Sequence, residues 1–437
     1  MKRLASTLAM VVVLAGLGAY IYFIDSKKPA DGGEVKEKAF GEVPSEAIEE
    51  IQLGLAGEKP AKLVKSDDTW RLVEPTPADA DANEVQSLVG SLSSLDIQRV
   101  VDEKGGDLAQ YGLAPAQIDL SFKVKDQAAP RHILFGNKTT TGGDIYAKLA
   151  DSPRVFLVAS FVESSIKKDP LSLRDKAILK VDRMKVDGFT VTTSKGTMEF
   201  AKKDANWTMV KPVAARADFG AVEGAIERLV STKMQALTAE EAGDLKPYGL
   251  DKPTATMVVK TGSSAATLIM GKTENSVVYA KDVSRPMIFT VAPILVTDVA
   301  KDPGEFRRKD VFDFRSFNAD RAEFVRGGTT QVFEKKKDKD GKDEWKNSSG
   351  ATVDTMKVED LLTKVSGLRA TSFDATVPAA MKTPALTVKT DFGGQSEMVT
   401  LAHAGTDVLA ARPDEPGVAK LDAAGLDEVV KALDALK

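Results

Sequence analysis

Histidine, cysteine and paired carboxylates most often carry chemistry in proteins, and this chain holds few of the first two. It contains His132 in "RHILFG", His403 in "LAHAGTD" and no Cys. A three-ligand zinc site would therefore need both histidines and a carboxylate from distant parts of the chain. The lack of Cys also excludes disulfides, a Cys nucleophile and a lipid-modified Cys anchor. We expect neither histidine to act in catalysis or to bind a metal, and we predict no cofactor.

Two polar segments superficially resemble ligand-binding loops. "GNKTTTGGD" (residues 136–144) lacks the Gly-Lys-Ser/Thr ending of a phosphate-binding loop. "EKKKDKDGKDEW" (residues 334–345) has Lys336 where a calcium-binding EF-hand loop needs Asp, and its five Lys balance five acidic residues. We predict an exposed hairpin loop in each place. No G-x-S-x-G nucleophile motif is present either, so we predict that the protein is not an enzyme.

Three carboxylates recur at equivalent places, and each precedes a run with helical spacing of apolar residues. After Asp81, for example, Val85, Leu88 and Leu92 recur three or four positions apart. Asp is a favoured N-cap, and Glu84 would stand at the third helical position to complete a capping box. We therefore interpret the three carboxylates as helix caps and not as acid–base groups: Asp81, Asp218 and Asp354.

The caps belong to an internal repeat. "WRLVEPTPADAD" (residues 70–81) returns as "WTMVKPVAARAD" (residues 207–218) at an offset of 137, and "YGL" returns at the same offset. A third, diverged copy keeps Trp345 but lacks the Tyr-Gly-Leu. We predict that each Trp ends a strand and packs beneath the capped helix as framework. The recurring anchors are Trp70, Trp207, Trp345, Tyr111, Gly112, Tyr248 and Gly249.

Each copy predicts the same local structure. "AKLVKSDDTWRLVEP" (residues 61–75) has two apolar runs around Asp67-Asp68, which indicates a hairpin. Upstream, "EEIQLGL" (residues 49–55) aligns with "KVDGFTV" (residues 185–191). The helix is followed by a glycine suited to a positive φ, several β-rich runs and a short last helix. We therefore expect an α+β module with a mainly antiparallel sheet.

The repeat also sets the predicted domain boundaries. We expect an anchor over residues 1–24, a linker over 25–42, and modules over 43–178, 179–316 and 317–437, the last being truncated. Charge clusters end the first two modules, and they would serve either as ion pairs at module junctions or as a docking site for a partner. The clusters are Arg174, Asp175 and Lys176, and Arg308, Lys309 and Asp310.

The amino-terminal run Leu4–Ile24 is uncharged and 21 residues long. At about 1.5 Å per residue a helix of this length spans roughly 30 Å, the hydrocarbon thickness of a bilayer. We predict an uncleaved, single-pass anchor in a bacterial inner membrane, with the amino terminus inside and the rest of the chain in the periplasm. Cleavage after Ala19 stays open as the alternative. The formal net charge of −4 does not favour a nucleic-acid partner.

Taken together, these motifs resemble the bacterial family known as domain of unknown function 4340. The resemblance rests on the repeated Trp…Pro…Asp, on Tyr-Gly-Leu…Pro, on Tyr146-Ala147 and on Leu173-Arg174-Asp175-Lys176, and it extends from about residue 43 onward. It implies a membrane-anchored protein whose partners are ABC-type export or gliding-motility transporters. It implies no catalytic residues.

We therefore expect a non-enzymatic accessory or scaffold protein that binds protein partners such as ABC transporter subunits. One alternative is a periplasmic glycan- or ligand-binding protein, although aromatic residues are scarce at 6%. A second alternative is an envelope hydrolase that uses two carboxylates in one groove.

Overall fold

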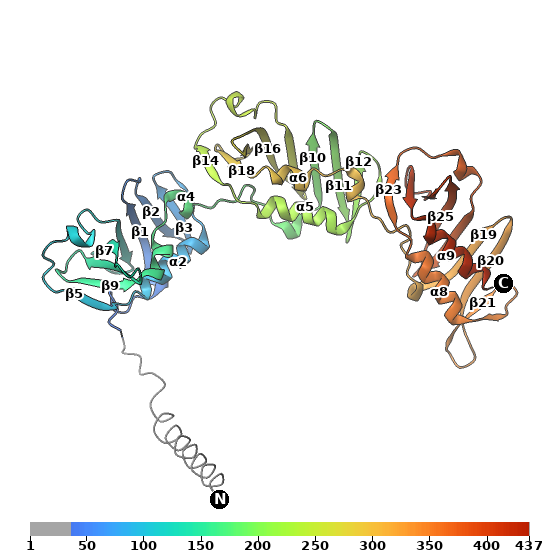
Figure 1. The fold of residues 1–437 in the computed structure, drawn as a ribbon, viewed down its shortest axis with the longest axis horizontal. Helices are drawn as coiled ribbons and strands as arrows, with labels where there is room; N and C mark the ends of the chain where they lie inside the picture. Colours follow the sequence, from blue (N-terminus) through green and yellow to red (C-terminus); the bar gives the residue numbers. More distant parts are fainter. Residues whose placement is uncertain (1–35, 437) are drawn as a thin grey trace, which may run out of the picture. The chain divides into compact units, whose positions relative to one another are not determined.

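The computed structural model describes residues 36–436 (Figure 1). The predicted anchor and the first part of the predicted linker, residues 25–35, lie outside these residues. Within residues 36–436, no helix is both long and apolar enough to cross a bilayer.

Three nine-stranded antiparallel sheets form the body of the protein, and they share one topology. The strand orders are β4-β3-β2-β1-β6-β7-β8-β9-β5, β13-β12-β11-β10-β15-β16-β17-β18-β14 and β22-β21-β20-β19-β24-β25-β26-β27-β23. Each sheet consists of two meanders that meet along their first strands. The expected α+β architecture of three tandem homologous modules is confirmed.

The elements of the three modules correspond one to one as far as the last sheet strand. The first module contains β1 (Ile48–Leu55), β2 (Ala61–Ser66), β3 (Thr69–Glu74), β4 (Ala78–Asp79), α2 (Ala82–Ser93), β5 (Arg99–Asp102), β6 (Ile118–Val124), β7 (Arg131–Lys138), β8 (Asp144–Leu149), β9 (Val155–Ala159), α3 (Glu163–Ile166) and α4 (Pro170–Leu173). The second contains β10 (Gly188–Thr193), β11 (Gly196–Lys203), β12 (Asn206–Lys211), β13 (Ala215–Arg216), α5 (Phe219–Ser231), β14 (Ala236–Ala239), β15 (Ala255–Thr261), β16 (Ser264–Glu274), β17 (Val277–Asp282), β18 (Ile288–Val291), α6 (Ile294–Val299) and α7 (Pro303–Phe306). The third contains β19 (Ala319–Arg326), β20 (Thr329–Lys337), β21 (Asp343–Asn347), β22 (Thr352–Val353), α8 (Thr355–Ser366), β23 (Ala370–Asp374), β24 (Leu386–Phe392), β25 (Gln395–Ala404), β26 (Asp407–Ala411), β27 (Val418–Leu421) and α9 (Ala423–Asp434).

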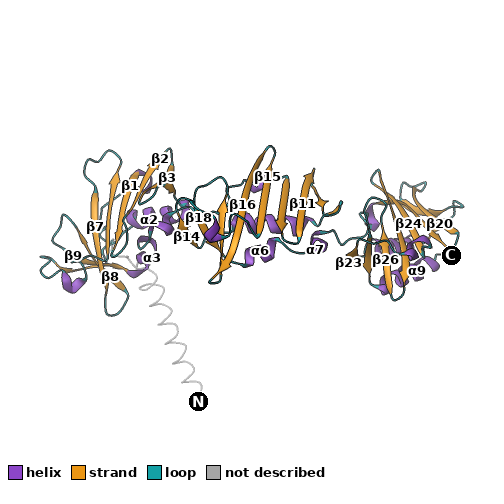
Figure 2. Ribbon diagram, turned by 90° about the horizontal axis from the view of Figure 1, so that it is seen from above, coloured by secondary structure: helices purple, strands orange, loops and turns teal. Residues whose placement is uncertain are grey.

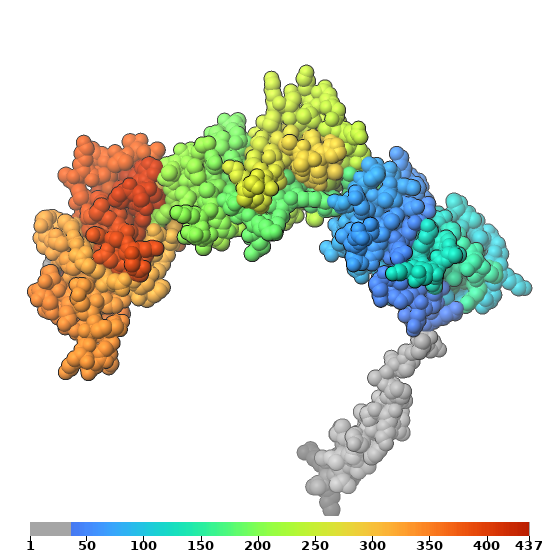
Figure 3. Space-filling view, turned by 180° about the vertical axis from the view of Figure 1, so that it is seen from behind, coloured from blue at the N-terminus to red at the C-terminus, as the bar shows by residue number. Residues whose placement is uncertain are grey.

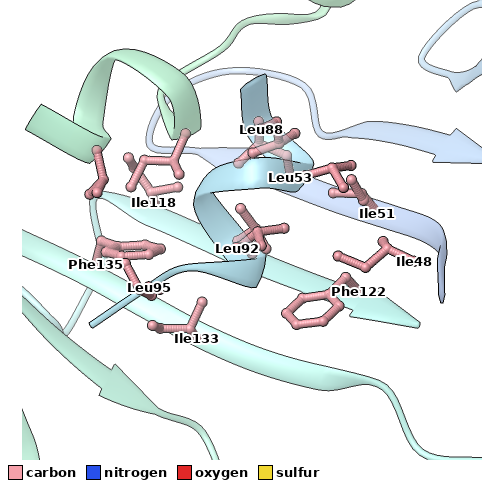
Figure 4. Packing of buried hydrophobic residues seen from close by; sticks show 14 of the residues in the cluster. Ile48, Ile51, Leu53, Leu88, Leu92, Leu95, Ile118, Phe122, Ile133 and Phe135 are labelled. Atoms are coloured by element: carbon pink, nitrogen blue, oxygen red, sulfur yellow. The ribbon is translucent and has the colours of Figure 1, made fainter. Parts of the chain in front are cut away.

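A capped helix of 12 or 13 residues packs on the sheet in each module, as α2 does in the first (Figures 2 and 4), and the third module adds α9 to its core. The side chains of Leu88 and Leu92 point from α2 toward Ile51, Ile118 and other strand residues (Figure 4). Burying a Leu or Ile side chain stabilises a fold by roughly 1.5–3 kcal/mol. The helical spacing of apolar residues is thus explained by one buried face.

The hairpin between β2 and β3 confirms the interpretation of Asp67-Asp68 as a turn. Both residues have positive φ, 48° and 62°, which a two-residue hairpin turn that matches the strand twist requires. The segment at residues 334–345 likewise spans the hairpin between β20 and β21, which projects from the third module (Figures 1 and 3). The segment at residues 136–144 joins β7 to β8 as predicted.

The alignment of the first strands requires a correction of two residues. Ile51 pairs with Leu63 in the first module, and Phe189 pairs with Phe200 in the second. Since Leu63 and Phe200 are 137 positions apart, Ile51 corresponds to Phe189 at an offset of 138. The sequence alignment had used 136. The aligned "KVD" (residues 185–187) precedes β10, whereas the aligned "EE" lies within β1.

Residues 36–42 lie against the first module and are not part of a free linker as predicted. The Ala39 amide donates to the Leu95 carbonyl at 2.8 Å, and the Phe40 ring meets Phe122 edge-on at 4.8 Å between centroids. Arg154 donates to both carboxylate oxygens of Glu37 at 3.0 and 3.2 Å. This segment therefore covers one end of the first core.

Candidate functional site

The recurring aspartates occupy the N-cap positions of α2, α5 and α8. Asp81 accepts hydrogen bonds from the backbone amides of Asn83 and Glu84 at 3.1 and 3.3 Å. Asp218 and Asp354 cap α5 and α8 in the same way. The expected capping box does not form in α2, because the Glu84 carboxylate pairs with Lys168 Nζ at 2.5 Å. These carboxylates are occupied in holding the helix ends.

The Tyr-Gly-Leu segments form a second structural unit with the following strands. Gly112 and Gly249 both adopt left-handed conformations, with φ of 68° and 67°, as the sequence predicted. The ring of Tyr248 lies 5.2 Å from that of Tyr279 between centroids. A Cβ on Gly271 would lie 2.1 Å from the Tyr248 carbonyl oxygen, and Gly136 would meet Tyr111 in the same way. The turn can pack this closely only on a strand glycine.

The third module lacks the Tyr-Gly-Leu turn, the strand glycine and the second tyrosine of this unit. Strand pairing places Leu401 opposite Leu386, as Met270 lies opposite Ala255 in the second module. The next residue is Ala402 where the second module has Gly271. The same reasoning places Leu409 at the position of Tyr279. Because the Tyr-Gly-Leu turn is absent, no glycine is needed at Ala402 and no aromatic ring at Leu409.

None of the three recurring Trp residues ends a strand as predicted: Trp70 and Trp207 are second in theirs, and Trp345 is in the middle of β21. Trp207 is the second residue of β12, and it is buried at 3% exposure. Its indole Nε1 donates to Glu223 Oε1 of α5 at 2.9 Å, and Lys202 Nζ reaches the same oxygen at 2.7 Å. Lys202 Nζ also lies 5.4 and 5.5 Å from the ring centroids of Trp207 and Phe219. The second module therefore closes this position with its own side chains.

The Glu223 carboxylate is held ionised by these contacts. Burial opposes its ionisation, but hydrogen bonds from Lys202 and Trp207 outweigh burial and lower the pKa of Glu223 below its ordinary value. Arg183 Nη2 adds an ion pair at 3.7 Å.

Trp70 in the first module has different surroundings, which corrects the expectation that all three indoles are buried alike. It is only half-buried and lines an open groove of about 730 Å³ between β3, β4 and α2. The groove is also lined by Lys65, Ala82 and Gln86. Strand pairing places Lys65 opposite Trp70, as Lys202 lies opposite Trp207. The helix caps place Ala82 and Gln86 where the second module has Phe219 and Glu223.

The recurring Trp of the third module is also buried, although Thr355 and the exposed Glu359 stand at the positions of Phe219 and Glu223. Trp345 is buried at 1% exposure, and Lys335 Nζ lies 5.2 Å from its ring centroid. The strand partner is also the same, because Lys335 pairs with Trp345. The groove therefore belongs to the first module.

The three carboxylates that line the Trp70 groove, those of Glu46, Asp68 and Asp79, are exposed and are poor candidates for acid–base chemistry. Asp68 Oδ1 lies 3.6 Å from Lys65 Nζ, and its side chain is 99% exposed. Asp79 Oδ1 lies 4.0 Å from Arg71 Nε, and its side chain is 55% exposed. A general acid usually has its pKa raised by burial, and this exposure supplies little desolvation.

Three of the residues predicted for a junction or docking site join the second module to the third, whose core includes Val311, Phe312 and Phe314 and so begins before the predicted boundary at residue 317. Arg308 Nη1 lies 2.6 Å from Asp313 Oδ1. Asp310 pairs with both Arg315 and Arg369 at 2.8 Å. The Lys309 carbonyl accepts from the Ala370 amide at 2.7 Å, and the Lys309 side chain is exposed.

A buried ion network extends this junction. Arg307 is 6% exposed, donates to Glu415 Oε2 at 2.7 Å and lies 3.9 Å from the Phe373 ring centroid. Arg216 also donates to Glu415, and its Nη1 donates to Asp313 Oδ1 at 2.7 Å. Buried pairs of this kind are costly to break singly, because one partner is then left without its counter-charge. Arg307 begins the charged run "RRKD" (residues 307–310) that the sequence analysis singled out. Glu415 was missed, because no equivalent of it recurs at a constant offset.

The first cluster occupies the corresponding place at the end of the first module. Ala80 and Arg174 form an isolated β-bridge, and the Asp175 amide donates to the Asp79 carbonyl at 2.8 Å. Arg174 is buried at 6% exposure, like Arg307. Lys176 is half-buried.

The two histidines lie on exposed strand faces of different modules. His132 Nε2 lies 2.7 Å from Asp119 Oδ1, and His403 is exposed on β25. Within residues 36–436, no group of three or more His, Cys, Asp or Glu side chains is placed to hold a metal ion.

A family described as "Domain of unknown function (DUF4340)" matches residues 70–206 and 207–386. The chain belongs to this family. Both matches begin at a repeat Trp, and therefore inside a sheet: Trp70 lies in β3 and Trp207 in β12. The boundaries of the DUF4340 matches therefore differ from those of the folded modules, because the first two sheets begin at β1 and β10.

Other comparisons add nothing about the function of this DUF4340 chain. No curated protein sequence matches it significantly. It is similar to two crystal structures of the DNA polymerase sliding clamp from Pseudomonas aeruginosa, one of them with ligand. The structure with ligand is 9% identical, with 89% of this chain and 93% of that chain covered and a TM-score of 0.17. The other is 8% identical, with 87% and 92% covered and a TM-score of 0.17. Scores this low support no inference.

The Trp70 groove was missed in the sequence, although a signal for it was present. At the offset of 137 that revealed the repeat, Gln86 aligns with Glu223 and Ala82 aligns with Phe219. A Phe replaced by Ala beside a Trp removes about one ring of volume. In the DUF4340 repeat, the positions at which the first and second copies have different residues therefore indicate the groove, and the recurring positions do not.

Proposed function

We propose that the chain is a non-enzymatic scaffold subunit of a bacterial envelope complex, held in the inner membrane by Leu4–Ile24. Its three modules would lie in the periplasm and bind protein partners. Subunits of an ABC-type export or gliding-motility transporter are the expected partners, by resemblance to the family. Binding at more than one module would raise the overall affinity through effective concentration.

One observation carries the proposal: the residues that recur in all three modules serve the fold. Asp81, Asp218 and Asp354 cap helices, and Trp207 and Trp345 fill cores. What the chain repeats is a folded module with its own surface, and a repeated surface suits extended binding better than a single reaction.

Affinity purification from membranes tests the proposal most directly. The full chain, with Leu4–Ile24 intact, should co-purify a transporter ATPase or permease from gently solubilised membranes. A variant in which Leu4–Ile24 is replaced by a cleavable signal peptide serves as the control, and it should release the chain from the membrane. Recovery of the full chain alone, over repeated cross-linked preparations, would refute the scaffold role.

Cysteine labelling tests the orientation separately, because the chain has no Cys of its own. Lys339 is exposed in the β20–β21 hairpin, so Lys339→Cys should react with a membrane-impermeant maleimide once the outer membrane is permeabilised. Ser6→Cys lies in the predicted span and should stay unlabelled. Labelling of Lys339→Cys only after lysis of the inner membrane would place the modules in the cytoplasm and overturn the predicted orientation.

A further inference from the structure

The groove beside Trp70 has a filled counterpart in the second module, and that counterpart shows which chemistry suits it. There, two donors converge on one carboxylate oxygen: Trp207 Nε1 at 2.9 Å and Lys202 Nζ at 2.7 Å from Glu223 Oε1. The indole N–H and the ammonium together stabilise the charged form of Glu223.

The first module keeps both kinds of donor and lacks the acceptor. Trp70 and Lys65 stand at the positions of Trp207 and Lys202, but Gln86 replaces Glu223. Within residues 36–436, the Trp70 indole N–H donates no hydrogen bond, and Lys65 Nζ has only long contacts, 3.4 Å to the Glu46 carbonyl and 3.6 Å to Asp68. Ala82 in place of Phe219 leaves room beside the indole.

We propose that the Trp70 groove binds a carboxylate carried by a Glu or Asp side chain of a partner protein. The Trp70 indole N–H and the Lys65 ammonium would donate to that carboxylate, as their counterparts do to Glu223. The aliphatic part of the partner side chain would pack on the Trp70 ring. This inference rests on the proposed scaffold function and names the chemistry of one of its contacts.

A polypeptide is favoured as the source because the occupant of the sister site is itself a glutamate side chain of a polypeptide. A volume of about 730 Å³ also leaves space for residues on both sides of that carboxylate. Ligand pockets commonly enclose about 300–1,000 Å³.

The acidic residues at the rim do not prevent binding of an acidic segment. Three acidic residues line the groove. Glu46 Oε2 accepts from Ser45 Oγ at 3.3 Å, and Asp68 and Asp79 lie 3.6 and 4.0 Å from Lys65 and Arg71, respectively. Ion pairs with a solvent-exposed carboxylate stabilise a fold only weakly. A partner carboxylate that also accepts from the indole can therefore displace Asp68 from Lys65.

A titration of the full ectodomain, labelled with ¹⁵N in its three Trp side chains, tests this inference. The probe is an acetylated and amidated Ala-Ala-Glu-Ala-Ala peptide, and the matched control carries Gln in place of Glu. Only the Trp70 indole signal should shift with the Glu peptide, and at least tenfold more weakly with the Gln peptide. Equal shifts with both peptides, or no shift with either, would overturn the proposal. A shift with an N-acetylglucosamine disaccharide but not with the Glu peptide would assign the groove to a glycan and overturn it as well.

Variants that fill the groove provide the second arm. Ala82→Phe with Gln86→Glu supplies the ring and the carboxylate of the second module, and should weaken peptide binding at least tenfold. Asn83→Glu adds the same charge to α2 at a residue that does not line the groove, and should leave binding unchanged. Equal peptide affinity for the wild type and the filled variant would contradict the proposal.

Co-purification from membranes separates this inference from the scaffold proposal. If the wild type recovers a partner and the filled variant loses it, both hold. If both recover the partner equally, the scaffold role stands and the groove is not its contact. If neither recovers a partner, the scaffold role fails, and the peptide titration still decides the chemistry of the groove.

Discussion

The first and second modules have the same strand order, the same capped helix and the same Trp–Lys pair on neighbouring strands. The surroundings of that Trp nevertheless differ between them. In the second module Trp207 is buried and hydrogen-bonded to Glu223. In the first, Trp70 lines a groove of about 730 Å³. On the neighbouring helix face, Ala82 and Gln86 stand where the second module has Phe219 and Glu223. A duplicated fold can thus differ at one site through the side chains that surround a recurring residue.

The largest expected effect concerns the two indoles. Trp207→Ala should destabilise the second module by about 3–5 kcal/mol, as buried aromatic truncations do. Trp70→Ala should destabilise the first by roughly half as much, about 1.5–2.5 kcal/mol, because less of its surface leaves water on folding. Hydrogen exchange followed by mass spectrometry on the full chain resolves the modules separately. Equal losses of protection in the two modules would mean that the two sites are packed alike.

The next effect sharpens the role of Glu223. Glu223→Gln should destabilise the chain by about 1–3 kcal/mol at pH 7, since hydrogen bonds from Lys202 and Trp207 to a charged acceptor are lost. Gln86→Glu in the first module should have the opposite sign, because it adds an acceptor near Trp70 and Lys65. Urea unfolding of both variants and of the wild type measures the changes in the free energy of unfolding. Destabilisation by Gln86→Glu would contradict the view that the Trp70 site lacks an acceptor.

The Glu223 effect should also depend on pH. Its pKa is lowered in the folded state relative to the ordinary value of 4.5, so its contribution to stability is present above the unfolded pKa and is lost as pH falls through the folded pKa. The difference in urea midpoint between wild type and Glu223→Gln should therefore be largest at pH 6–7 and shrink toward pH 3. A difference that stays constant over this range would show that the charge of Glu223 contributes nothing.

The smallest expected difference serves as a control on the comparison. Asp81→Ala and Asp218→Ala each remove an N-cap and should each cost about 1 kcal/mol. The two losses should agree to within about 0.5 kcal/mol when each module is followed by hydrogen exchange. A much larger loss for one cap would show that the modules differ in more than the Trp site.

Much of the fold could be predicted from the sequence because local rules act on single residues. The three Asp caps, the Asp67-Asp68 turn and the left-handed Gly112 and Gly249 were all correctly predicted. Each needs only a side chain that accepts from nearby amides or a backbone without steric restriction.

Features set by distant pairing were missed. The alignment of β1 with β10 was wrong by two residues, since only the pairing of each strand with its neighbours fixes it. The position of β5 at the far edge of the sheet depends on pairing with β9 alone. The groove depends on what Ala82 and Gln86 fail to fill, and no single residue shows that.

Solvent exchange of the three Trp indole N–H protons, measured by NMR on the ¹⁵N-Trp-labelled chain, tests the central comparison most directly. Signals would be assigned with Trp70→Phe, Trp207→Phe and Trp345→Phe. The Trp70 proton should exchange with water at least tenfold faster than the Trp207 proton, which is held by Glu223. Equal protection of the Trp70 and Trp207 protons would contradict the account, because it would mean that the first module closes this position as its copies do.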